Sequence, residues 1–337
     1  MEKSRIKNSK IQISKLSFGT SALGDMPDTY GYSVNEGRAR ETINAIFDSE
    51  CNLIDTSRNY GFGIAEKRIG QVIQERGGLP DDFVISTKLD RNMKTQKFDA
   101  ARARKSIEES LEALKVDRIG LLHLHDPEHC KDITEITGSN GSLAELFKMK
   151  EEGLAETVGL AMGKTELMLE IIKEWPFDAI INHNRFTLLN RNADELYSYA
   201  YSNNISIINA APYASGVLAK GTEKSRLIAY SEATDQELEP VKELEKICAK
   251  YSVPLPAAAL QFSLNDKRIS STLVGVTKPK RVSETINLSK FIIPNEAWEE
   301  IDQLPYTTHD VEAARQYKPG SVSYTHLSCR RNRTWGG

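Results

Sequence analysis

The feature that most restricts the fold of this chain is an alternation of short β-rich runs with segments whose apolar residues recur at helical spacing. Residues 39–47, 107–114, 143–147 and 196–200 show the helical spacing. Alternating strands and helices predict a parallel sheet, either an open doubly wound sheet or a closed (β/α)8 barrel. The predicted strands are Leu16–Gly19, Asn52–Asp55, Phe83–Thr87, Ile119–Leu124, Thr157–Leu160, Ala179–Ile181, Ser206–Asn209 and Thr272–Gly275.

Two observations favour the closed barrel. No G-x-G-x-x-G run follows the first strand, so the dinucleotide-binding signature of many open sheets is missing. Ionisable residues also stand at the ends of several different strands, as barrel enzymes require. We therefore predict an α/β protein, a single-domain (β/α)8 barrel over residues 1–312. The long interval 210–271, with helices at Glu237–Tyr251 and Ala257–Leu264, is an insertion that could cover one mouth of the barrel.

The last residues, 313–337, differ in composition from the rest. This stretch contains no acid but five Lys or Arg residues, and it is rich in Ser and Gly. Such a composition predicts a disordered tail. The run SVSYTHLSCRRNRTWGG also resembles translated adapter or vector sequence, and we base no functional argument on it.

Composition excludes several classes of function. A formal net charge of −3 gives no reason to expect a nucleic acid or an anionic membrane as partner. No apolar run approaches the ~18 residues that span a bilayer, and the charged N-terminus does not resemble a secretory signal. The cysteines are widely spaced, which indicates free thiols and a cytoplasmic protein: Cys51, Cys130, Cys248 and Cys329. A monomer and a weak homo-oligomer both remain open.

Three of the predicted strands lead into an ionisable side chain. Asp55 ends NLID, Lys88 follows FVIST, and His125 ends IGLLHLH. Parallel strands place their carboxyl ends at the same rim of a barrel, so these side chains are expected to meet. Tyr60 lies in the loop that leaves the second strand and can reach over the same rim. A buried Asp55 carboxylate needs a partner, and Lys88 on the neighbouring strand is available.

The four residue types suit proton transfer. A tyrosine hydroxyl has an ordinary pKa of about 10 and needs help to act near neutral pH. We expect the Lys88 ammonium to lower the pKa of Tyr60, with Asp55 keeping the ammonium charged and oriented. His125 can donate a hydrogen bond to an oxygen bound above Tyr60. Such a pocket can hold a carbonyl or hydroxyl oxygen and move one proton while a hydride leaves or reaches carbon.

Each residue also has a simpler structural interpretation. A strand-end Asp often caps a turn, a lone Lys forms a surface ion pair, and a Tyr in an Asn-Tyr-Gly turn packs. His123 shares the parity of His125 and could be a core histidine. A zinc site at His123, His125 and His129 is disfavoured because Asp126-Pro127 interrupts the spacing, so no metal is predicted.

The blocks NLIDTSRNYGFGIAEKRIG, FVISTKLDR and RIGLLHLHDPE resemble signature blocks of the aldo-keto reductase superfamily. The resemblance covers residues 16–294 and includes Glu66 and Gly70. STKLDR, HNRFTLLNR and INAAPYASGVLAKG are similar to the D-threo-aldose 1-dehydrogenase and L-fucose dehydrogenase group. The resemblance implies a (β/α)8 barrel, a nicotinamide cofactor across its carboxyl mouth, and a catalytic tetrad. Carried over residue by residue, the tetrad is Asp55, Tyr60, Lys88 and His125.

The implied cofactor site departs from the family pattern. Gly275-Val276 stands where a Lys-Ser pair often occurs, and the loss of a Lys that could pair with a 2′-phosphate favours NAD over NADP, although Arg281, which is kept together with Glu284, could still bind such a phosphate. The Ser-Asn pair after the fifth strand is here Ala161-Met162, and the tyrosine that stacks on the nicotinamide is here Ala210. His183 or Asn184 is the candidate for the missing amide contact, and a loop from Ser215 to Leu218 for the pyrophosphate. The full set of expected cofactor residues is Gly19, Thr20, Asp55, His183, Asn184, Ser215, Gly216, Val217, Leu218, Gly275, Val276, Thr277, Arg281 and Glu284.

From these residues we expect an NAD(P)-dependent enzyme that oxidises an aldose of the L-fucose or D-threo type at C1 to the lactone, with Tyr60 as acid and base. An aldehyde or ketone reductase and a pyridoxal-type dehydrogenase are alternatives on the same scaffold. More remote alternatives are a Schiff-base aldolase that uses Lys88 and a nicotinamide-binding subunit without turnover.

Overall fold

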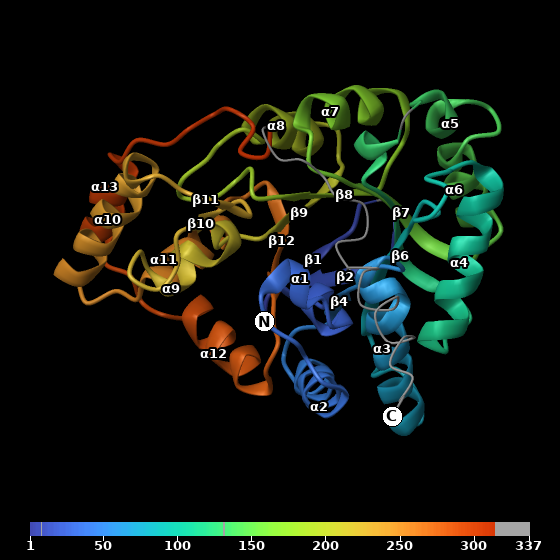
Figure 1. Ribbon diagram of the computed structural model, residues 1–337, viewed down its shortest axis with the longest axis horizontal. Helices are drawn as coiled ribbons and strands as arrows, with labels where there is room; N and C mark the ends of the chain where they lie inside the picture. The colour runs from blue at the N-terminus through green and yellow to red at the C-terminus, as the bar shows by residue number, and fades with distance from the viewer. Residues whose placement is uncertain (8, 131, 314–337) are drawn as a thin grey trace, which may run out of the picture.

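A closed barrel of parallel strands is the centre of the computed structural model, which describes residues 1–313 except 8 and 131 (Figure 1). The strands follow one another around the barrel in chain order, and the last pairs with the first and with the preceding strand to close it. The predicted fold is confirmed. The strands are β3 (Leu16–Gly19), β4 (Leu53–Asp55), β5 (Val84–Leu89), β6 (Ile119–His125), β7 (Ala155–Ala161), β8 (Ala179–His183), β9 (Ser206–Ala210) and β12 (Ile269–Gly275).

Helices connect the successive parallel strands and surround the barrel (Figure 1). Local capping helps to set where they begin: the Asn35 side chain accepts the Arg38 N–H ahead of α2, and the Asp99 side chain accepts the Arg102 N–H ahead of α4. The helices that follow successive barrel strands are α2 (Glu36–Phe47), α3 (Ile64–Glu75), α4 (Ala100–Leu114), α6 (Ser142–Glu151), α7 (Thr165–Glu174), α8 (Asp194–Ser202), α11 (Leu255–Leu264) and α12 (Pro279–Ser289).

Alternate residues of each strand face two different cores. One parity packs inside the barrel with Leu53, Val84 and Leu121, and the other packs against the helices with Ile54, Ile85 and Leu122. Both faces of the strands are therefore buried, which explains why their sequences read as nearly continuous apolar runs. Asp55, Lys88 and His125 each lie an even number of residues beyond an inward-facing residue of the same strand. They therefore point into the carboxyl mouth of the barrel.

A two-stranded hairpin closes the opposite end of the barrel. It consists of β1 (Lys3–Arg5) and β2 (Gln12–Ser14), and its Ile6, Ile11 and Ile13 join the inner core. A cavity of about 880 Å³ lies beside this hairpin, next to the amino ends of β5, β6 and β7. Because the reacting groups of barrel enzymes come from the carboxyl ends of the strands, this cavity is not the candidate active site.

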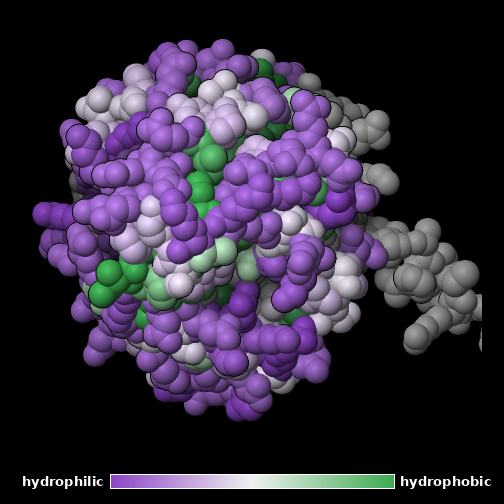
Figure 2. All heavy atoms as spheres, turned by 90° about the vertical axis from the view of Figure 1, so that its left-hand side faces the viewer, coloured by the Kyte–Doolittle hydropathy of each residue, from purple (hydrophilic) through white to green (hydrophobic). Residues whose placement is uncertain are grey.

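The insertion between β9 and β12 builds a second core beside the barrel. It contains η4 (Ala214–Gly216), α9 (Val217–Lys220), β10 (Leu227–Ile228), β11 (Ser231–Glu232) and α10 (Asp235–Lys250). At the edge of the molecule α10 packs against α13 (Asn295–Asp302), so this helix does not cover the mouth (Figure 1). Figure 2 shows this side with hydrophobic side chains in small groups among hydrophilic ones, as on a solvated surface.

The chain crosses back to the barrel after α13. Residues 307–312 run beside the loop that follows β8, where the Thr307 N–H donates to Leu189 O and the Arg191 N–H donates to Thr307 O. Within the described residues, no helix combines the length and apolar character needed to cross a membrane. Cys51, Cys130 and Cys248 are free thiols. The predicted disordered tail lies outside the described residues from 314 onward.

Two short 3-10 helices, η1 (Ser21–Gly24) and η2 (Tyr60–Gly63), meet at a contact that only glycine permits. Gly61 has φ +60°, and a Cβ added to it would lie 1.9 Å from the Gly24 carbonyl oxygen. A Cβ on Gly24 would lie 2.7 Å from the Tyr60 carbonyl carbon. This backbone contact fixes where Tyr60 stands over the mouth.

We expect Gly61→Ala to displace η2 and to lower the free energy of unfolding by more than the left-handed conformation alone costs, about 1–2 kcal/mol. Gly31→Ala is the matched control, because Gly31 also has a positive φ (+74°) but no heavy atom near the added Cβ. Urea unfolding of both variants measures the difference. Equal losses would show that the Gly24–Gly61 contact does not hold the loop.

Candidate active site

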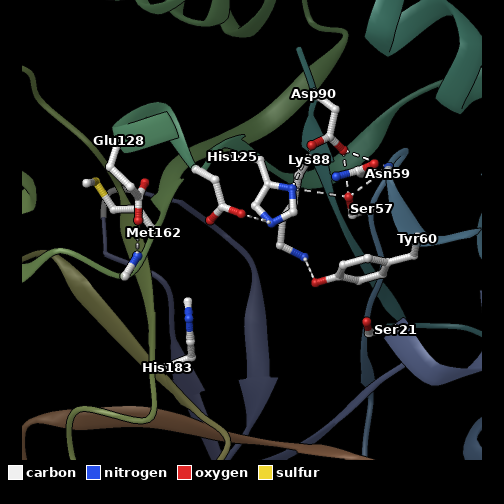
Figure 3. A network of polar contacts seen from close by, with 12 residues as sticks. Ser21, Ser57, Asn59, Tyr60, Lys88, Asp90, His125, Glu128, Met162 and His183 are labelled. Atoms are coloured by element: carbon white, nitrogen blue, oxygen red, sulfur yellow. Dashed lines mark hydrogen bonds and ion pairs between the residues drawn. The ribbon is translucent and has the colours of Figure 1, made fainter. Parts of the chain in front are cut away.

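The structure brings the four predicted residues together at the carboxyl mouth of the barrel. Asp55 ends β4, Lys88 lies near the end of β5, His125 ends β6, and Tyr60 opens η2. Asp55, Lys88 and His125 are buried, whereas Tyr60 keeps part of its surface accessible. Figure 3 shows the Tyr60 hydroxyl and the His125 ring on either side of the Lys88 ammonium.

The Lys88 ammonium has a partner for each of its hydrogens. Its Nζ lies 2.7 Å from Asp55 Oδ2, 2.6 Å from Thr56 O and 3.2 Å from the Tyr60 hydroxyl. An ammonium has three donors, so all three are committed. The Tyr60 oxygen accepts from Lys88, which leaves its own hydrogen available for an oxygen bound in the mouth. Lys88 is therefore the partner that the buried Asp55 carboxylate requires.

The second oxygen of Asp55 accepts a hydrogen bond from a side chain deeper in the barrel. The Ser86 hydroxyl donates to Asp55 Oδ1 at 2.8 Å and lies 3.4 Å from His123 Nδ1. Burial, followed by the charge of Lys88, holds the pKa of His123 well below its ordinary value of 6.5. His123 is therefore a neutral residue inside the barrel, in line with its interpretation as a core histidine, although its buried Nε2 lacks a hydrogen-bond partner.

The prediction that the Lys88 ammonium lowers the pKa of Tyr60 is wrong. The pKa of the phenol lies well above its ordinary value of 10.0, mainly because of burial and next because of the Asp55 carboxylate. Asp55 offsets the ammonium of Lys88, so the pair as a whole gives the phenolate little help. In the protein alone, Tyr60 is a neutral phenol that is ready to donate its hydrogen.

His125 has a buried carboxylate as partner that the sequence analysis did not single out. Its Nδ1 lies 2.7 Å from Asp90 Oδ1, and the other oxygen of Asp90 accepts from the Ser57 hydroxyl at 2.6 Å and the Asn59 N–H at 2.8 Å. Asp90 is 3% exposed. One signal could have revealed it: Ser86, Lys88 and Asp90 share the inward parity of β5.

A second carboxylate lies on the other side of the imidazole. Asp126 Oδ2 is 3.6 Å from His125 Nε2. Burial by itself lowers the pKa of His125, but the charges of Asp126 and Asp90 outweigh that effect and hold the pKa above its ordinary value of 6.5. The imidazole at this mouth is therefore more readily protonated than an exposed histidine.

The residues expected to hold a cofactor lie around the rest of the rim. Ala161 and Ala210 end β7 and β9 with inward parity and flank His183, the last residue of β8. Around the barrel β12 follows β9 and β3 follows β12, and α12 comes directly after β12 in the chain. Arg281 and Glu284 on α12 are joined by an ion pair of 3.2 Å.

Two of the expected cofactor residues have structural bonds as well. The Thr20 hydroxyl and N–H both donate to Asp55 O at 2.9 Å, which ties η1 to β4. Ser215 has φ +64° and its hydroxyl accepts the Tyr230 N–H at 2.9 Å, so the insertion hairpin braces the Ser215–Gly216 turn. Val217 and Leu218 are buried in the second core, so only their backbone can face a ligand.

The C-terminal segment reaches the rim at β8. Glu312 Oε1 lies 3.2 Å from His183 Nε2 and accepts from Asn184 Nδ2 at 3.0 Å and Arg185 at 3.1 Å. Burial raises the pKa of Glu312, but His183 and Arg185 outweigh it and the pKa lies below the ordinary value. The sequence analysis missed this contact, because nothing in the local pattern links residue 312 with residue 183.

Unpaired acceptors at this rim fit a ligand that carries an amide. Asn184 Oδ1 is buried without a partner, and so is Glu128 Oε2, whose other oxygen accepts the Gly163 N–H at 2.6 Å. Burial, with help from Asp126, raises the pKa of Glu128 to about 7. Buried acceptors without donors are rare, and a carboxamide NH₂ would satisfy such groups. The residues present therefore fit the nicotinamide end of a dinucleotide.

Fold and site define a (β/α)8-barrel protein with ionisable side chains gathered at its carboxyl mouth. The sequence model of the Aldo/keto reductase family matches residues 15–305. The chain belongs to this family, whose members are oxidoreductases that use nicotinamide cofactors and act on small-molecule carbonyl compounds.

Relatives and solved structures agree with this membership. The chain is 28% identical to a D-threo-aldose 1-dehydrogenase from Pseudomonas sp, over 86% of this chain and 94% of that one. It is 28% identical to an L-galactose dehydrogenase from Arabidopsis thaliana, over 83% and 85% of the two chains. An aldo-keto reductase from Bacillus halodurans in its holo form, 19% identical, has the same fold with a TM-score of 0.75 over 94% of this chain and all of that chain.

Replacing Lys88 tests the buried ion pair. We expect Lys88→Met to lower the free energy of unfolding by about 3–5 kcal/mol, because it leaves the Asp55 carboxylate buried and unpaired. Asp55→Asn in the same chain should recover part of that loss, which a double-mutant cycle by urea unfolding measures.

Lys150→Met is the matched control for this cycle. Lys150 pairs with Asp178 at 2.6 Å, but the Lys150 side chain is 32% exposed and Asp178 keeps the Val158 N–H as donor. We expect this variant to lose less than Lys88→Met. An equal loss would show that the Asp55–Lys88 pair has no special weight.

Proposed function

We propose that this protein oxidises an aldose at C1 to the lactone, with hydride transfer to a nicotinamide cofactor and with Tyr60 as the acid and base. The observation that carries the proposal is the Asp55–Lys88–Tyr60 chain of contacts beside His125 at one mouth. The matches to an aldose and a galactose dehydrogenase support a sugar as substrate. Carboxylates that suit sugar hydroxyls also lie near the mouth, among them Asp126 beside His125 and Glu312 beside His183.

In this proposal each residue of the chain has a separate task. The Tyr60 phenol first releases its own proton, and the resulting phenolate, which the charge-assisted hydrogen bond from Lys88 stabilises, then takes the proton of the C1 hydroxyl. Asp55 keeps Lys88 charged and directed at Tyr60. His125 binds the same substrate oxygen from the other side. Lys88 lacks a free amine for Schiff-base chemistry, since its ammonium is bonded in three directions, which argues against an aldolase.

The cofactor would occupy the remaining rim. Asn184 and Glu128 would receive its carboxamide, the Ser215–Gly216 turn its pyrophosphate, and α12 its adenosine end near Arg281. When bound, the nicotinamide supplies the two-electron acceptor that a barrel of ordinary side chains lacks. We propose NAD ahead of NADP, because Gly275-Val276 replaces the Lys-Ser pair and Glu284 already neutralises Arg281.

One observation favours a second candidate, reduction of a small aldehyde or ketone. The raised pKa of Tyr60 makes it a proton donor at rest, and donation to a carbonyl oxygen is the reductive half of the same chemistry. A 25% identical pyridoxal 4-dehydrogenase from Microbacterium luteolum, aligned over 88% of this chain and 95% of that one, adds pyridoxal to the substrates worth testing.

Tyr60→Phe removes the hydroxyl and keeps the ring. We expect turnover to fall by at least about 100-fold, the usual size of an acid–base contribution, with cofactor affinity close to that of the wild type. Tyr32→Phe, on an exposed ring of the neighbouring loop, is the control and should keep full activity. Near-normal turnover in Tyr60→Phe would rule out Tyr60 as the acid and base.

A substrate panel separates the candidates. L-fucose, D-arabinose and pyridoxal are offered with NAD⁺ and NADP⁺, and a simple aldehyde with NADH and NADPH, while the nicotinamide absorbance is followed. We expect oxidation of a sugar with NAD⁺ to have the highest kcat/KM. Faster reduction of the aldehyde would favour the second candidate, and cofactor binding without turnover would indicate a non-catalytic subunit.

A further inference from the structure

The bonds around Asp90 fix the position of one hydrogen on His125. Two acceptors lie at Nδ1: Asp90 Oδ1 at 2.7 Å and Ser57 Oγ at 3.2 Å. The Ser57 hydroxyl gives its single hydrogen to Asp90 Oδ2 at 2.6 Å, so toward His125 it presents a lone pair. A nitrogen faced by a carboxylate and a hydroxyl lone pair carries a hydrogen. The Nδ1 atom is therefore the protonated one.

Asp90 is itself held in place. Its backbone N–H donates to Ser106 Oγ at 3.0 Å, and its carbonyl accepts from Arg102 Nε at 2.8 Å, both from α4. The contacts with His125 and Ser57 outweigh burial and hold the pKa of Asp90 below its ordinary value of 3.8. The carboxylate thus stays charged at neutral pH and keeps its hydrogen bond to Nδ1.

The opposite nitrogen, Nε2, is the one left for substrate. Asp126 Oδ2 at 3.6 Å is too distant for a direct hydrogen bond. The His125 side chain is 10% accessible. In the proposed function, on which this inference rests, His125 binds the reacting oxygen. Whether Nε2 donates or accepts a hydrogen bond then decides which form of the substrate His125 binds.

We propose that Asp90 is a positioning residue that keeps the hydrogen of neutral His125 on Nδ1, so that Nε2 donates to a substrate oxygen only as imidazolium and, when neutral, competes with Tyr60 for the hydrogen of a substrate hydroxyl. His125 thereby distinguishes the carbonyl form of the substrate from the hydroxyl form according to its own protonation. This adds Asp90, with Ser57 behind it, to the residues that determine how the site meets its substrate.

The pH dependence follows from the groups around the ring. The charged or titratable groups that face His125 are Asp90 and Lys88 from β5, Asp126 after β6, His123 deeper on β6, Tyr60 on η2 and His129 on the short helix after β6. Since the carboxylates hold the pKa of His125 above 6.5, the Nε2 hydrogen is present below that raised pKa and is lost as pH rises through it. Donation to a carbonyl should be lost over the same range.

Asp90→Asn should move the hydrogen to the other nitrogen. The Oδ2 position of Asp90 accepts two hydrogen bonds, from Ser57 and Asn59, whereas Oδ1 accepts from His125. An amide that keeps its oxygen toward Ser57 and Asn59 presents its NH₂ to Nδ1. Nδ1 must then be the bare nitrogen, so neutral His125 carries its hydrogen on Nε2.

The test uses the full chain labelled with ¹⁵N-histidine and needs no substrate. Ring ¹⁵N shifts report which nitrogen is protonated, and His125→Gln identifies the His125 signals. Above the pKa of His125 we expect a protonated Nδ1 and a bare Nε2 in the wild type and in Asp126→Asn, and the reverse in Asp90→Asn. Asp126→Asn is the matched control, because it also removes one carboxylate beside the ring and suits the left-handed backbone at this position (φ +45°).

A hydrogen on Nε2 of neutral wild-type His125 would overturn the proposal, even if Asp90→Asn failed to fold. An unchanged tautomer in folded Asp90→Asn would overturn it equally. With a carbonyl substrate from the panel, wild-type kcat/KM for reduction should fall about tenfold per pH unit above the pKa of His125, while Asp90→Asn should lose this fall. Absence of turnover would count against the proposed function and leave the ¹⁵N result to decide the role of Asp90.

Discussion

The buried contact between Asp55 and Lys88 is the interaction on which the mouth of this barrel depends. A carboxylate and an ammonium at 2.7 Å, each nearly inaccessible, are stable there only because each satisfies the other and further polar groups complete both. The third hydrogen of Lys88 then has one direction left, toward Tyr60. The glycine contact between η1 and η2 holds Tyr60 where it can receive that hydrogen.

Around this pair the mouth carries two acid–base systems of different character. Tyr60 is a neutral phenol whose pKa is raised by burial, while His125 lies between two carboxylates that favour its protonated form. Both pKa values are raised, the first by burial and the second by neighbouring carboxylates, so both groups hold a proton that they can offer to a bound oxygen. On the same rim the small residues Ala161 and Ala210 end the strands on either side of β8.

Much of this arrangement could be predicted from local sequence. The strands are buried on both faces, so their apolar runs located them to within a few residues, and strand ends placed Asp55, Lys88 and His125 at one rim. Asp90 was missed because it follows the end of β5, where only the continued parity marks it. The Glu312 contact joins residues far apart in the chain, which no local pattern records. The direction of the Tyr60 pKa depends on how strongly burial and Asp55 outweigh Lys88, and a sequence does not give that balance.

The central claim is that Tyr60 and His125 hold one substrate oxygen between them beside a bound nicotinamide. The most direct measurement is a crystal structure of the ternary complex with the cofactor and a lactone or carbonyl ligand. The account predicts the ligand oxygen within about 2.6–3.2 Å of both the Tyr60 hydroxyl and His125 Nε2, with its carbon facing the nicotinamide ring. A ligand oxygen bound away from both side chains, or a cofactor bound outside the carboxyl mouth, would contradict it.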